Sequence, residues 1–386
     1  MYKILKLNDI ATEGLLAFGS NYHIGNEVTS PDAILLRSYN MHEMAIPPNL
    51  LAVGRAGSGV NNIPLEKMSK MAIPVFNAPG ANANAVKELV LAAILISARN
   101  IHRAINYVNT LKDSEDLKSE VESAKREYVG FELPNKTLGV IGLGSIGVKV
   151  ANACHDLGMK VIGYDPMISV DNAINLVPGI KKIDDLNELL KKIDILTIHI
   201  PYSQETKGFI SSSEISLLNQ NTTIINLSRE EIVDTESIVS ALQENRIDTY
   251  VTDFPKVELI GNPDVLLMPH LGASTKEAEI NCALMVANSL ISFIEDGNII
   301  NSVNFPNVSL IRDTEHRLTI TNLNKPNMLG QFTSLLGKAN ININDLSHKN
   351  FKQIGYTILN IEKPLTENVV KQINNIDGVI KTNILS

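Results

Sequence analysis

The sequence predicts an α/β fold with two doubly wound parallel-sheet domains and a smaller C-terminal βαββαβ module. Short apolar strands alternate with helical segments over most of the chain, which is typical of parallel sheets. A glycine-rich turn at Gly142–Gly147 joins one strand to a helix, and residues 312–386 show a different order of elements. At 386 residues the chain also exceeds what one hydrophobic core usually organises.

The first region alternates strands and helices and ends in a long apolar helix. That helix is expected over Ala85–Ile105, where Leu, Ile and Ala are frequent. The charged segment Lys112–Glu127, which is followed by Gly130 and Pro134, is expected to be a solvated connection. The strands before the helix are expected at Lys3–Leu7, Ala33–Arg37, Leu51–Val53 and Pro74–Asn77.

The strongest local signal runs from Leu138 to Asp165. An apolar strand leads into GLGSIG, a helix follows, and a second strand ends at Asp165, 18 residues beyond Gly147. Gly142 permits the tight turn, Gly144 lets a pyrophosphate approach the backbone, and Gly147 lets the helix lie close to the sheet. Asp165 would accept hydrogen bonds from the adenosine ribose and repel a 2′-phosphate, so a Rossmann-like domain that prefers NAD to NADP is expected.

Strands and helices continue to alternate after Asp165, which predicts that ligands lie beyond the carboxyl ends of parallel strands. The helix from Ser274 to about Asp296 is long enough to leave this domain. We expect it to pack on the first domain, which would make that domain discontinuous. The remaining strands are expected at Ile193–Ile200, Thr223–Asn226, Asp248–Thr252 and Val265–Met268.

The C-terminal region predicts a ferredoxin-like module. Alternation favours a strand over Arg317–Asn322, and Pro326 suits the first turn of a helix. Strands at Ile341–Ile343 and Ile354–Ile361, a helix through Val369–Ile376 and a strand at Val379–Ile384 complete the order. The predicted domains are residues 1–97 with 281–305, residues 98–280 and residues 312–386.

Composition excludes several classes of function. The net charge is −8 with no long Lys/Arg run, which argues against nucleic-acid binding. The longest apolar run, Leu89–Ile96, is too short to span a membrane, and no signal peptide is readable, so a cytoplasmic protein is expected. Cys154 and Cys282 form no metal-ligand pattern, which predicts a reduced, metal-free chain with Cys154 as a buried thiol.

Three polar residues after the glycine turn suit hydride transfer. Arg229 follows a strand end, Glu258 lies in DFPKVE, and His270 lies in MPHLGAST. Oxidising a secondary alcohol requires a base for the hydroxyl proton, and neutral His serves near pH 7. Glu258 could orient that His through its other ring nitrogen, and Arg229 could clamp a substrate carboxylate with two hydrogen bonds.

Each of these residues also has a structural interpretation. His270 could be a hydrogen-bonded turn residue, Arg229 could pair with the neighbouring glutamates, and Glu258 could be an ordinary surface carboxylate. Their joint order after a dinucleotide motif favours the catalytic interpretation.

At these motifs the chain resembles the D-isomer-specific 2-hydroxyacid dehydrogenases, and within them the short members that carry a C-terminal ACT domain. The resemblance covers essentially the whole chain. VGRAGSGVNNI and MPHLGASTKEAE together are specific for this type of enzyme. Further matching segments are NAPGANANAVKELV, HIPYSQETKGFI, INLSREEIVD and NSVNFP.

The resemblance implies that Arg229 binds the substrate carboxylate, that Glu258 and His270 form the catalytic pair, and that Asp253 contacts the nicotinamide amide. Substrate contacts are expected from the backbone of Gly57, Ser58 and Gly59, from Asn82, and from Arg37 and Arg55 as phosphate ligands; both arginines could instead be structural. The expected NAD-binding residues are Gly142, Gly144, Ser145, Ile146, Gly147, Asp165, His199, Ile200, Pro201, Thr206, Leu227, Ser228, Asp253, Gly272 and Ala273.

Two departures from the family pattern stand out. Many relatives have Gly directly after the catalytic arginine, where this chain has Glu230. That carboxylate could weaken the binding of an anionic substrate or could point to solvent. Asn327 stands where Gly is usual, and Asn tolerates a left-handed backbone better than most residues.

The terminal module resembles an ACT domain in NLNKPNMLGQF. The resemblance implies an L-serine site between subunits, with Asn322, Asn324 and Asn342 along one edge of each module. Such a site requires a homo-oligomer, a homodimer or homotetramer. Asn322 stands where serine-binding relatives can carry histidine, which makes this expectation weaker than the catalytic one.

The function implied is NAD-dependent oxidation of 3-phospho-D-glycerate to 3-phosphooxypyruvate, which enters serine biosynthesis. One alternative is a reductase for hydroxypyruvate, glyoxylate or another 2-oxoacid. A second is an NAD-sensing binding protein without enzymatic activity. Arg37 and Arg55 together with the terminal module favour the phosphorylated substrate.

Overall fold

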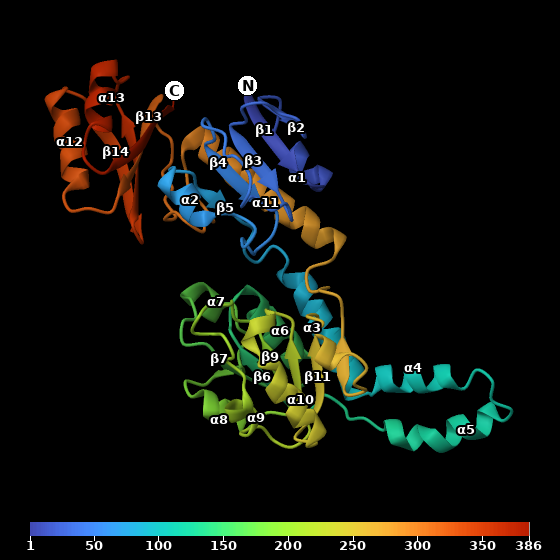
Figure 1. Cartoon of the computed structure of the whole chain (residues 1–386). Coiled ribbons are helices and arrows are strands. Elements are labelled where there is room, and N and C mark those ends of the chain that lie inside the picture. Colours follow the sequence, from blue (N-terminus) through green and yellow to red (C-terminus); the bar gives the residue numbers. More distant parts are fainter. Residues whose placement is uncertain (386) are drawn as a thin grey trace. The chain divides into compact units, whose positions relative to one another are not determined.

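The computed structural model describes residues 1–385, which divide into two compact units. The first unit comprises Met1–Asn82 and the chain from Lys276 onward, and the second comprises Ala83–Thr275. Each contains a parallel sheet with helices packed against it (Figure 1). The predicted α/β class with doubly wound sheets is therefore confirmed.

The second unit is built on a seven-stranded parallel sheet with the order β12-β11-β10-β9-β6-β7-β8. Starting from β6, the strands β7 and β8 are added on one side of the sheet, and β9 to β12 are then added on the other. This reversal puts the switch point of the strand order at the carboxyl ends of β6 and β9, which is where Rossmann-like sheets bind ligands. The strands are β6 (Thr137–Ile141), β7 (Lys160–Tyr164), β8 (Lys181–Lys182), β9 (Ile195–Ile198), β10 (Thr222–Asn226), β11 (Ile247–Thr252) and β12 (Val265–Leu267).

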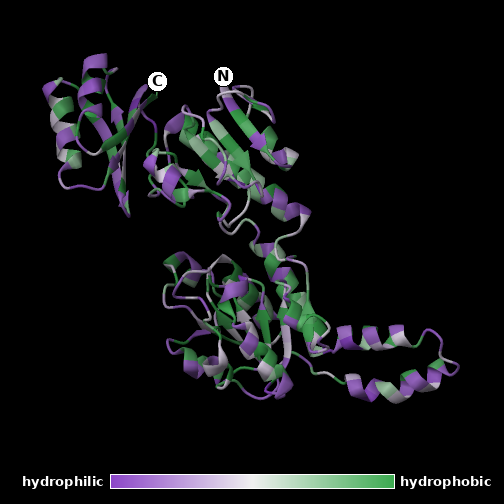
Figure 2. Cartoon of the chain, viewed as in Figure 1, coloured by the Kyte–Doolittle hydropathy of each residue, from purple (hydrophilic) through white to green (hydrophobic). Residues whose placement is uncertain are grey.

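Helices cover both faces of this sheet, so its central strands are buried on both sides. Every residue of β9 and β10 is buried, including the polar Thr197, Thr222, Thr223 and Asn226, as expected for strands covered on both faces. Figure 2 shows hydrophobic residues, in green, gathered in the interior strands of this unit. The helical elements are α3 (Ala83–Ala98), α4 (Ile101–Thr110), α5 (Leu117–Ala124), η1 (Lys125–Tyr128), α6 (Ser145–Asp156), α7 (Val170–Ile174), α8 (Leu186–Leu190), α9 (Ser212–Ile215), η2 (Glu230–Ile232), α10 (Thr235–Gln243) and η3 (Val257–Leu259).

The segment that follows α3 differs from the prediction. The expected single helix is broken at Asn100, which adopts a left-handed conformation with φ 50°, and α4 begins after it. The expected solvated connection contains α5, whose N-cap Asp116 accepts a hydrogen bond from the Ser119 backbone NH. Packing of the Tyr107 and Tyr128 rings, 5.6 Å apart, supports the α4–α5 hairpin (Figure 1). The local cap and the long-range ring contact stabilise helical structure in a segment whose polar composition favoured a solvated connection.

Helix α3 packs on the second unit, although the predicted boundaries assign it to the first domain. Its buried residues Val86, Val90 and Ile94 share a hydrophobic core with Val140 of β6 and Ala151 of α6. The division between the units falls before α3, and the chain returns to the first unit at Lys276. Packing partners that are distant in sequence set this boundary.

The first unit contains a five-stranded parallel sheet with the order β2-β1-β3-β4-β5. The short strand β2 is absent from the predicted set. Helix α11 crosses this sheet so closely that a Cβ at Gly54 would lie 2.5 Å from Val286 Cγ1. The elements are β1 (Tyr2–Leu7), α1 (Thr12–Leu16), β2 (Tyr22–Gly25), β3 (Ala33–Leu36), β4 (Ala52–Arg55), α2 (Leu65–Lys70), β5 (Val75–Phe76) and α11 (Lys276–Asp296).

Helix α11 is long and apolar enough to cross a membrane by length and composition alone. Half of its apolar stretch is buried within the structure, which is usual for the central helix of a core. Ala283, Val286, Ala287 and Leu290 are all buried against the sheet.

The terminal module has the predicted βαββαβ order, and its antiparallel sheet has the strand order β14-β15-β13-β16. Phe332 and Leu336 of its first helix and Ile373 of its second are buried against the strands. The ferredoxin-like prediction is confirmed. The elements are β13 (His316–Leu323), α12 (Met328–Lys338), β14 (Ile343–Phe351), β15 (Ile354–Ile361), α13 (Glu367–Asn374) and β16 (Val379–Leu385).

A buried arginine joins this module to the end of α11. The fully buried Arg317 donates from Nε to Asn360 Oδ1 (2.8 Å), from Nη1 to the carbonyl of Asp296 (2.7 Å) and from Nη2 to the carbonyl of Leu310 (3.0 Å). Because Asp296 is the last residue of α11, its carbonyl carries partial negative charge that favours a cation. The Tyr356 hydroxyl donates to the carbonyl of Gly297 at 2.7 Å and continues the junction.

Replacing Arg317 should therefore destabilise the first unit. Arg317→Ala leaves the buried Asn360 Oδ1 and two half-buried carbonyls without this donor, and a loss of about 3 kcal/mol or more in the free energy of unfolding is expected. Urea denaturation followed by circular dichroism measures the loss. Lys338→Ala removes an exposed basic side chain from the same module and should change stability by less than about 0.5 kcal/mol. Equal stability of the two variants would contradict the assigned role of Arg317.

Candidate active site

The glycine turn after β6 has the geometry of a diphosphate-binding loop. Gly142 has φ 88°, and a Cβ there would lie 2.6 Å from the His199 carbonyl. A Cβ at Gly147 would lie 1.9 Å from the Gly142 carbonyl, so only glycine allows α6 to approach the strand. Gly144, the N-cap of α6, has no atom within 4 Å of its Cβ position. The loop thus leaves open space next to a helix N-terminus with unpaired NH groups, which fits a dinucleotide diphosphate.

Asp165 follows β7 and is tied to this loop. Its Oδ2 accepts a hydrogen bond from the Leu143 backbone NH, and its Oδ1 accepts one from the Met167 NH, both at 2.8 Å. These bonds fix the carboxylate at the carboxyl edge of the sheet. Each oxygen retains a second lone pair for a ribose hydroxyl.

Asp253 connects the ends of β11 and β12. Only 1% of the residue is exposed, and its Oδ2 accepts a hydrogen bond from the Gly272 backbone NH at 2.8 Å. Its carbonyl accepts from the His270 NH, also at 2.8 Å. The buried Oδ1 has no hydrogen-bond partner among the described residues. An unpaired buried carboxylate oxygen is costly, and an amide donor such as the nicotinamide carboxamide would satisfy it.

His270 is held in a conformation that is rare for a residue other than glycine. Its φ is 45°, in the left-handed region, and its ring packs edge-on against Phe254 with 5.2 Å between ring centroids. Such backbone strain persists only where the surroundings support it, and it concentrates at functional sites. Here the Asp253 carbonyl and the Phe254 ring provide the support. Sequence reasoning missed Phe254, whose only signal is its position directly after Asp253.

The loop that carries Arg229 is organised by Asn226, the fully buried last residue of β10. Asn226 Nδ2 donates to the Arg229 carbonyl at 2.9 Å, and its Oδ1 accepts from the Ser228 hydroxyl at 2.8 Å. Arg229 itself is exposed, with Nη1 donating to the Ser228 carbonyl at 2.6 Å. Asn226 is not among the residues predicted from the sequence, although a polar residue at the end of an apolar strand can indicate a role in organising the next loop.

The unusual Glu230 has a partner. Its Oε1 lies 3.1 Å from Nζ of Lys256, which belongs to the loop after β11. The negative charge beside Arg229 is therefore locally compensated, and the Glu230 side chain is also 47% exposed to solvent. Its effect on the binding of an anionic substrate stays a prediction.

Glu258 and His270 are not hydrogen-bonded to each other within residues 1–385. Glu258 lies in η3 and is exposed, as is His270. Both follow the carboxyl ends of neighbouring strands, β11 and β12. Catalytic hydrogen bonds are often formed only in the complex with substrate. The catalytic pair stays a prediction.

His199 and Thr206 lie in the loop after β9. Burial lowers the pKa of His199 to about 3, so the ring is neutral at physiological pH. Its Nε2 lies 2.9 Å from Thr197 Oγ1, whereas its buried Nδ1 has no partner in the described chain. The Thr206 hydroxyl donates to the Pro201 carbonyl at 2.8 Å and accepts from the Ser203 NH at 2.7 Å. Thr206 therefore holds the loop shape.

The other expected cofactor residues of the second unit occupy the same strand-end loops. Ser145 and Ile146 begin α6, and Ile200 follows β9. Leu227 is buried directly after β10, and Ala273 follows Gly272. The expected buried thiol is confirmed, because Cys154 of α6 is fully buried.

The expected substrate residues lie in the first unit. Arg37 forms an ion pair with Glu279 at 2.6 Å, and Arg55 Nε donates to the Arg37 carbonyl at 3.0 Å. Asn77 Nδ2 donates to the Ser58 carbonyl at 2.6 Å, which shapes the glycine-rich turn that also contains Gly57 and Gly59. Asn82 has a buried Oδ1 that lacks a partner in the described structure.

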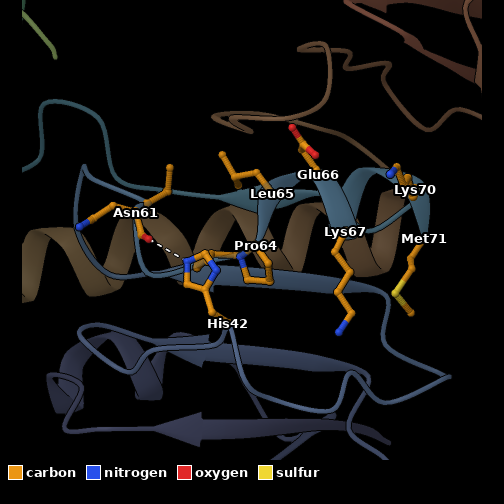
Figure 3. Close-up of a pocket in the computed structure, with 10 residues that line it drawn as sticks. His42, Asn61, Pro64, Leu65, Glu66, Lys67, Lys70 and Met71 are labelled. Atoms are coloured by element: carbon orange, nitrogen blue, oxygen red, sulfur yellow. Dashed lines mark hydrogen bonds between the residues drawn. The ribbon is translucent and has the colours of Figure 1, made fainter. Parts of the chain in front are cut away.

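A surface groove of the first unit lies elsewhere. It runs beside α2, where His42 Nε2 lies 3.0 Å from the Asn61 carbonyl and Lys67 and Lys70 border the opening (Figure 3). None of the residues expected to bind cofactor or substrate lines this groove.

The asparagines expected along one edge of the terminal module lie at opposite ends of its sheet. The register pairs Asn322 with Gly355, and Gly355 with Asn350 of β14. Asn342 precedes β14, eight residues before Asn350, which is about 26 Å along a strand. The expected single edge within one chain is therefore wrong, because the antiparallel hairpin separates the residues.

The individual environments of these asparagines also differ. Asn322 is fully buried, and its Oδ1 has no partner among the described residues. Asn324 Nδ2 donates to the Lys352 carbonyl at 3.1 Å. Asn342 is exposed. Asn327 adopts the left-handed conformation, with φ 63°, at the start of α12.

Comparisons with known proteins agree with this geometry. Residues 91–272 match the D-isomer specific 2-hydroxyacid dehydrogenase, NAD binding domain. D-3-phosphoglycerate dehydrogenase of Haemophilus influenzae is 31% identical over 356 residues, which cover 88% of this chain and 82% of the relative. The Escherichia coli K12 enzyme of that name is 30% identical over 349 residues, covering 87% and 82%.

Solved structures show the same fold. An NAD-bound 3-phosphoglycerate dehydrogenase of Entamoeba histolytica has a TM-score of 0.62 at 24% identity and covers 78% of this chain and 98% of its own. Holo D-mandelate dehydrogenase of Rhodotorula graminis has a TM-score of 0.69 at 20% identity, with coverages of 80% and 99%.

The glycine loop and the matching NAD-binding domain identify an NAD-dependent dehydrogenase of the D-2-hydroxyacid class. Within that class the chain belongs to the D-3-phosphoglycerate dehydrogenase family. The predictions of an oxidoreductase and of NAD as its cofactor are confirmed.

Cofactor preference should depend on Asp165. Asp165→Ala removes the ribose acceptor and the charge that repels a 2′-phosphate, so a strong preference for NAD should fall by about tenfold or more. The ratio of kcat/KM with NAD to that with NADP measures the change. Asp171→Ala, an exposed carboxylate in α7, is the control. Equal efficiency of the unaltered protein with both cofactors would contradict the role of Asp165.

Proposed function

We propose that this protein oxidises 3-phospho-D-glycerate to 3-phosphooxypyruvate with NAD, in the cytoplasm, at the entry to serine biosynthesis. The observation that supports this best is the double role of Asp253. Its carbonyl and Oδ2 fix the loop of His270 and Gly272, while Oδ1 stays available for the carboxamide. These bonds would hold His270, as the base, beside the expected place of the nicotinamide ring.

His270 would take the proton of the C2 hydroxyl during the reaction. NAD, when bound, supplies the acceptor for the hydride that leaves the same carbon. Glu258 would stabilise the imidazolium from the other ring nitrogen, and Arg229 would clamp the substrate carboxylate with two parallel hydrogen bonds. The compensation of Glu230 by Lys256 keeps the surroundings of Arg229 compatible with an anion.

The first unit would bind the rest of the substrate. The backbone around Ser58 and Gly59 would meet the carboxylate. Asn82 would contribute its Oδ1, which has no hydrogen-bond partner among the described residues. Arg37 and Arg55 would bind the phosphate, since paired guanidinium groups suit a phosphate dianion.

Initial rates with a panel of 2-hydroxyacids test this function. We expect NADH formation with 3-phospho-D-glycerate, and a kcat/KM at least about tenfold lower with D-glycerate because its phosphate contacts are lost. A preference for hydroxypyruvate or glyoxylate in the reverse direction would favour a reductase instead. Binding of NAD without turnover of any of these compounds would point to an NAD sensor.

His270→Ala should lower kcat by about a hundredfold or more, because the general base is lost. NAD binding, followed by calorimetry, should persist because the glycine loop is unchanged. His316→Ala, in the terminal module, is the matched control and should retain activity. A near-normal kcat of the His270 variant would assign the base to another residue.

We also propose a homo-oligomer, either a homodimer or a homotetramer. Helix α4 has no buried residue in the described chain, and Ile101, Ile105 and Val108 are exposed on it. In the terminal module, two antiparallel copies would bring Asn342 of one close to Asn322 and Asn324 of the other. An amino acid effector such as L-serine would then bind between copies.

L-Serine is therefore expected to bind and to lower activity. An effector at a distant site acts only by binding one domain arrangement more tightly, and typical couplings amount to about 1 to 3 kcal/mol. Calorimetry measures binding, initial rates measure inhibition, and D-serine is the control ligand. Absence of binding at millimolar L-serine would refute the site, whereas binding without inhibition would refute the coupling.

A further inference from the structure

The first unit contains an ion pair between Arg37 and Glu279. Arg37 is one of the expected phosphate ligands, whereas Glu279 has no part in the proposed reaction. Arg37 directly follows β3, and its Nη1 lies 2.6 Å from Oε1 of Glu279 in the first turn of α11. The two residues are 242 positions apart in the sequence. The pair therefore exists only because α11 returns to pack on the sheet of the first unit.

The backbone of Arg37 is held as firmly as its side chain. Its carbonyl accepts hydrogen bonds from Arg55 Nε at 3.0 Å and from Asn62 Nδ2 at 3.2 Å. The guanidinium of Arg55 occupies the space where a Cβ of Gly57 would lie. Both guanidinium groups thus belong to one network at the carboxyl ends of β3 and β4.

A buried thiol lies in the same neighbourhood. Burial raises the pKa of Cys282, one turn after Glu279; the charges of Arg37 and Arg55 lower it, and that of Glu279 raises it. Arg37, Arg55 and Glu279 are therefore all close enough to influence the Cys282 thiol. The three charged groups form one cluster beside the first turn of α11.

Stability does not explain the ion pair. The side chains are 40% and 44% exposed, and solvent-exposed pairs contribute little to the free energy of unfolding. The carboxylate does restrict a long side chain that would otherwise sample many rotamers. It occupies Nη1, and the remaining NH groups of the guanidinium can still donate to a second anion.

We propose that Glu279 is a positioning residue that holds the guanidinium of Arg37 in the orientation that receives the phosphate of the substrate. This inference rests on the proposed function, because it assigns Arg37 to that phosphate. The carboxylate and the phosphate would approach the guanidinium through different NH groups. Because the site is open to water, screening reduces their mutual repulsion, and orientation dominates the outcome.

The test compares steady-state kinetics of the full chain and of the variants Glu279→Gln, Arg37→Ala and their combination. Glu279→Gln should raise KM for 3-phospho-D-glycerate by about fivefold at unchanged kcat, because it loses binding that is equal in ground and transition states. KM for D-glycerate and the Kd for NAD should not change. In the Arg37→Ala background the Glu279 substitution should have no further effect, as expected for two residues that act through one contact.

Glu277→Gln is the matched control, since it removes the same charge from an exposed position on the same turn of α11. It should leave every parameter unchanged. An unchanged or lower KM in Glu279→Gln overturns the inference, and so does an equal rise in the Arg37→Ala background. If the unaltered protein turns over D-glycerate but not 3-phospho-D-glycerate, the proposed function fails, and this inference fails with it. Kinetics of the unaltered protein identify that outcome before any variant is compared.

Discussion

The cofactor edge of the second unit depends on the buried carboxylate of Asp253. A charge removed from water needs partners, and the Gly272 NH supplies one to Oδ2. The carbonyl of the same residue holds His270 in a left-handed conformation that only such support allows. One residue therefore ties two strand ends together, and its Oδ1 keeps no hydrogen-bond partner among residues 1–385. Asn226 acts in a similar way on the neighbouring loop, where it fixes Ser228 and Arg229.

The terminal module is firmly joined to the sheet that holds the expected substrate residues. Tyr356 and Ile358 share a hydrophobic core with Phe293 of α11, and Arg317 closes the end of that helix with three hydrogen bonds. An effector bound to the module would act on the first unit as a whole. This differs from a regulatory module on a free linker, whose ligand has no packed element through which to bias the enzyme.

Helix α11 contacts the terminal module at one end and the Arg37 side chain at the other. Its last turn receives Arg317 of the terminal module, and its first turn presents Glu279 to Arg37. The intervening residues are buried against β4, where Gly54 allows close contact. The helix therefore connects the terminal module and the residue that pairs with Arg37 through one continuously packed element.

The amino-acid sequence by itself determined the parallel sheets, the glycine loop, Asp165 and the βαββαβ order, because each depends on local periodicity or on glycine and acid residues at short spacing. The placement of Arg229, Glu258 and His270 just after strand ends also follows from local pattern. The sequence could not reveal the contact between the Tyr107 and Tyr128 rings in the α4–α5 hairpin, the assignment of α3 to the second unit, or the separation of Asn322 from Asn342. Nor could it show the pairing of Glu230 with Lys256 or of Arg37 with Glu279. These features depend on contacts between residues far apart in the chain, which only the packed tertiary structure decides.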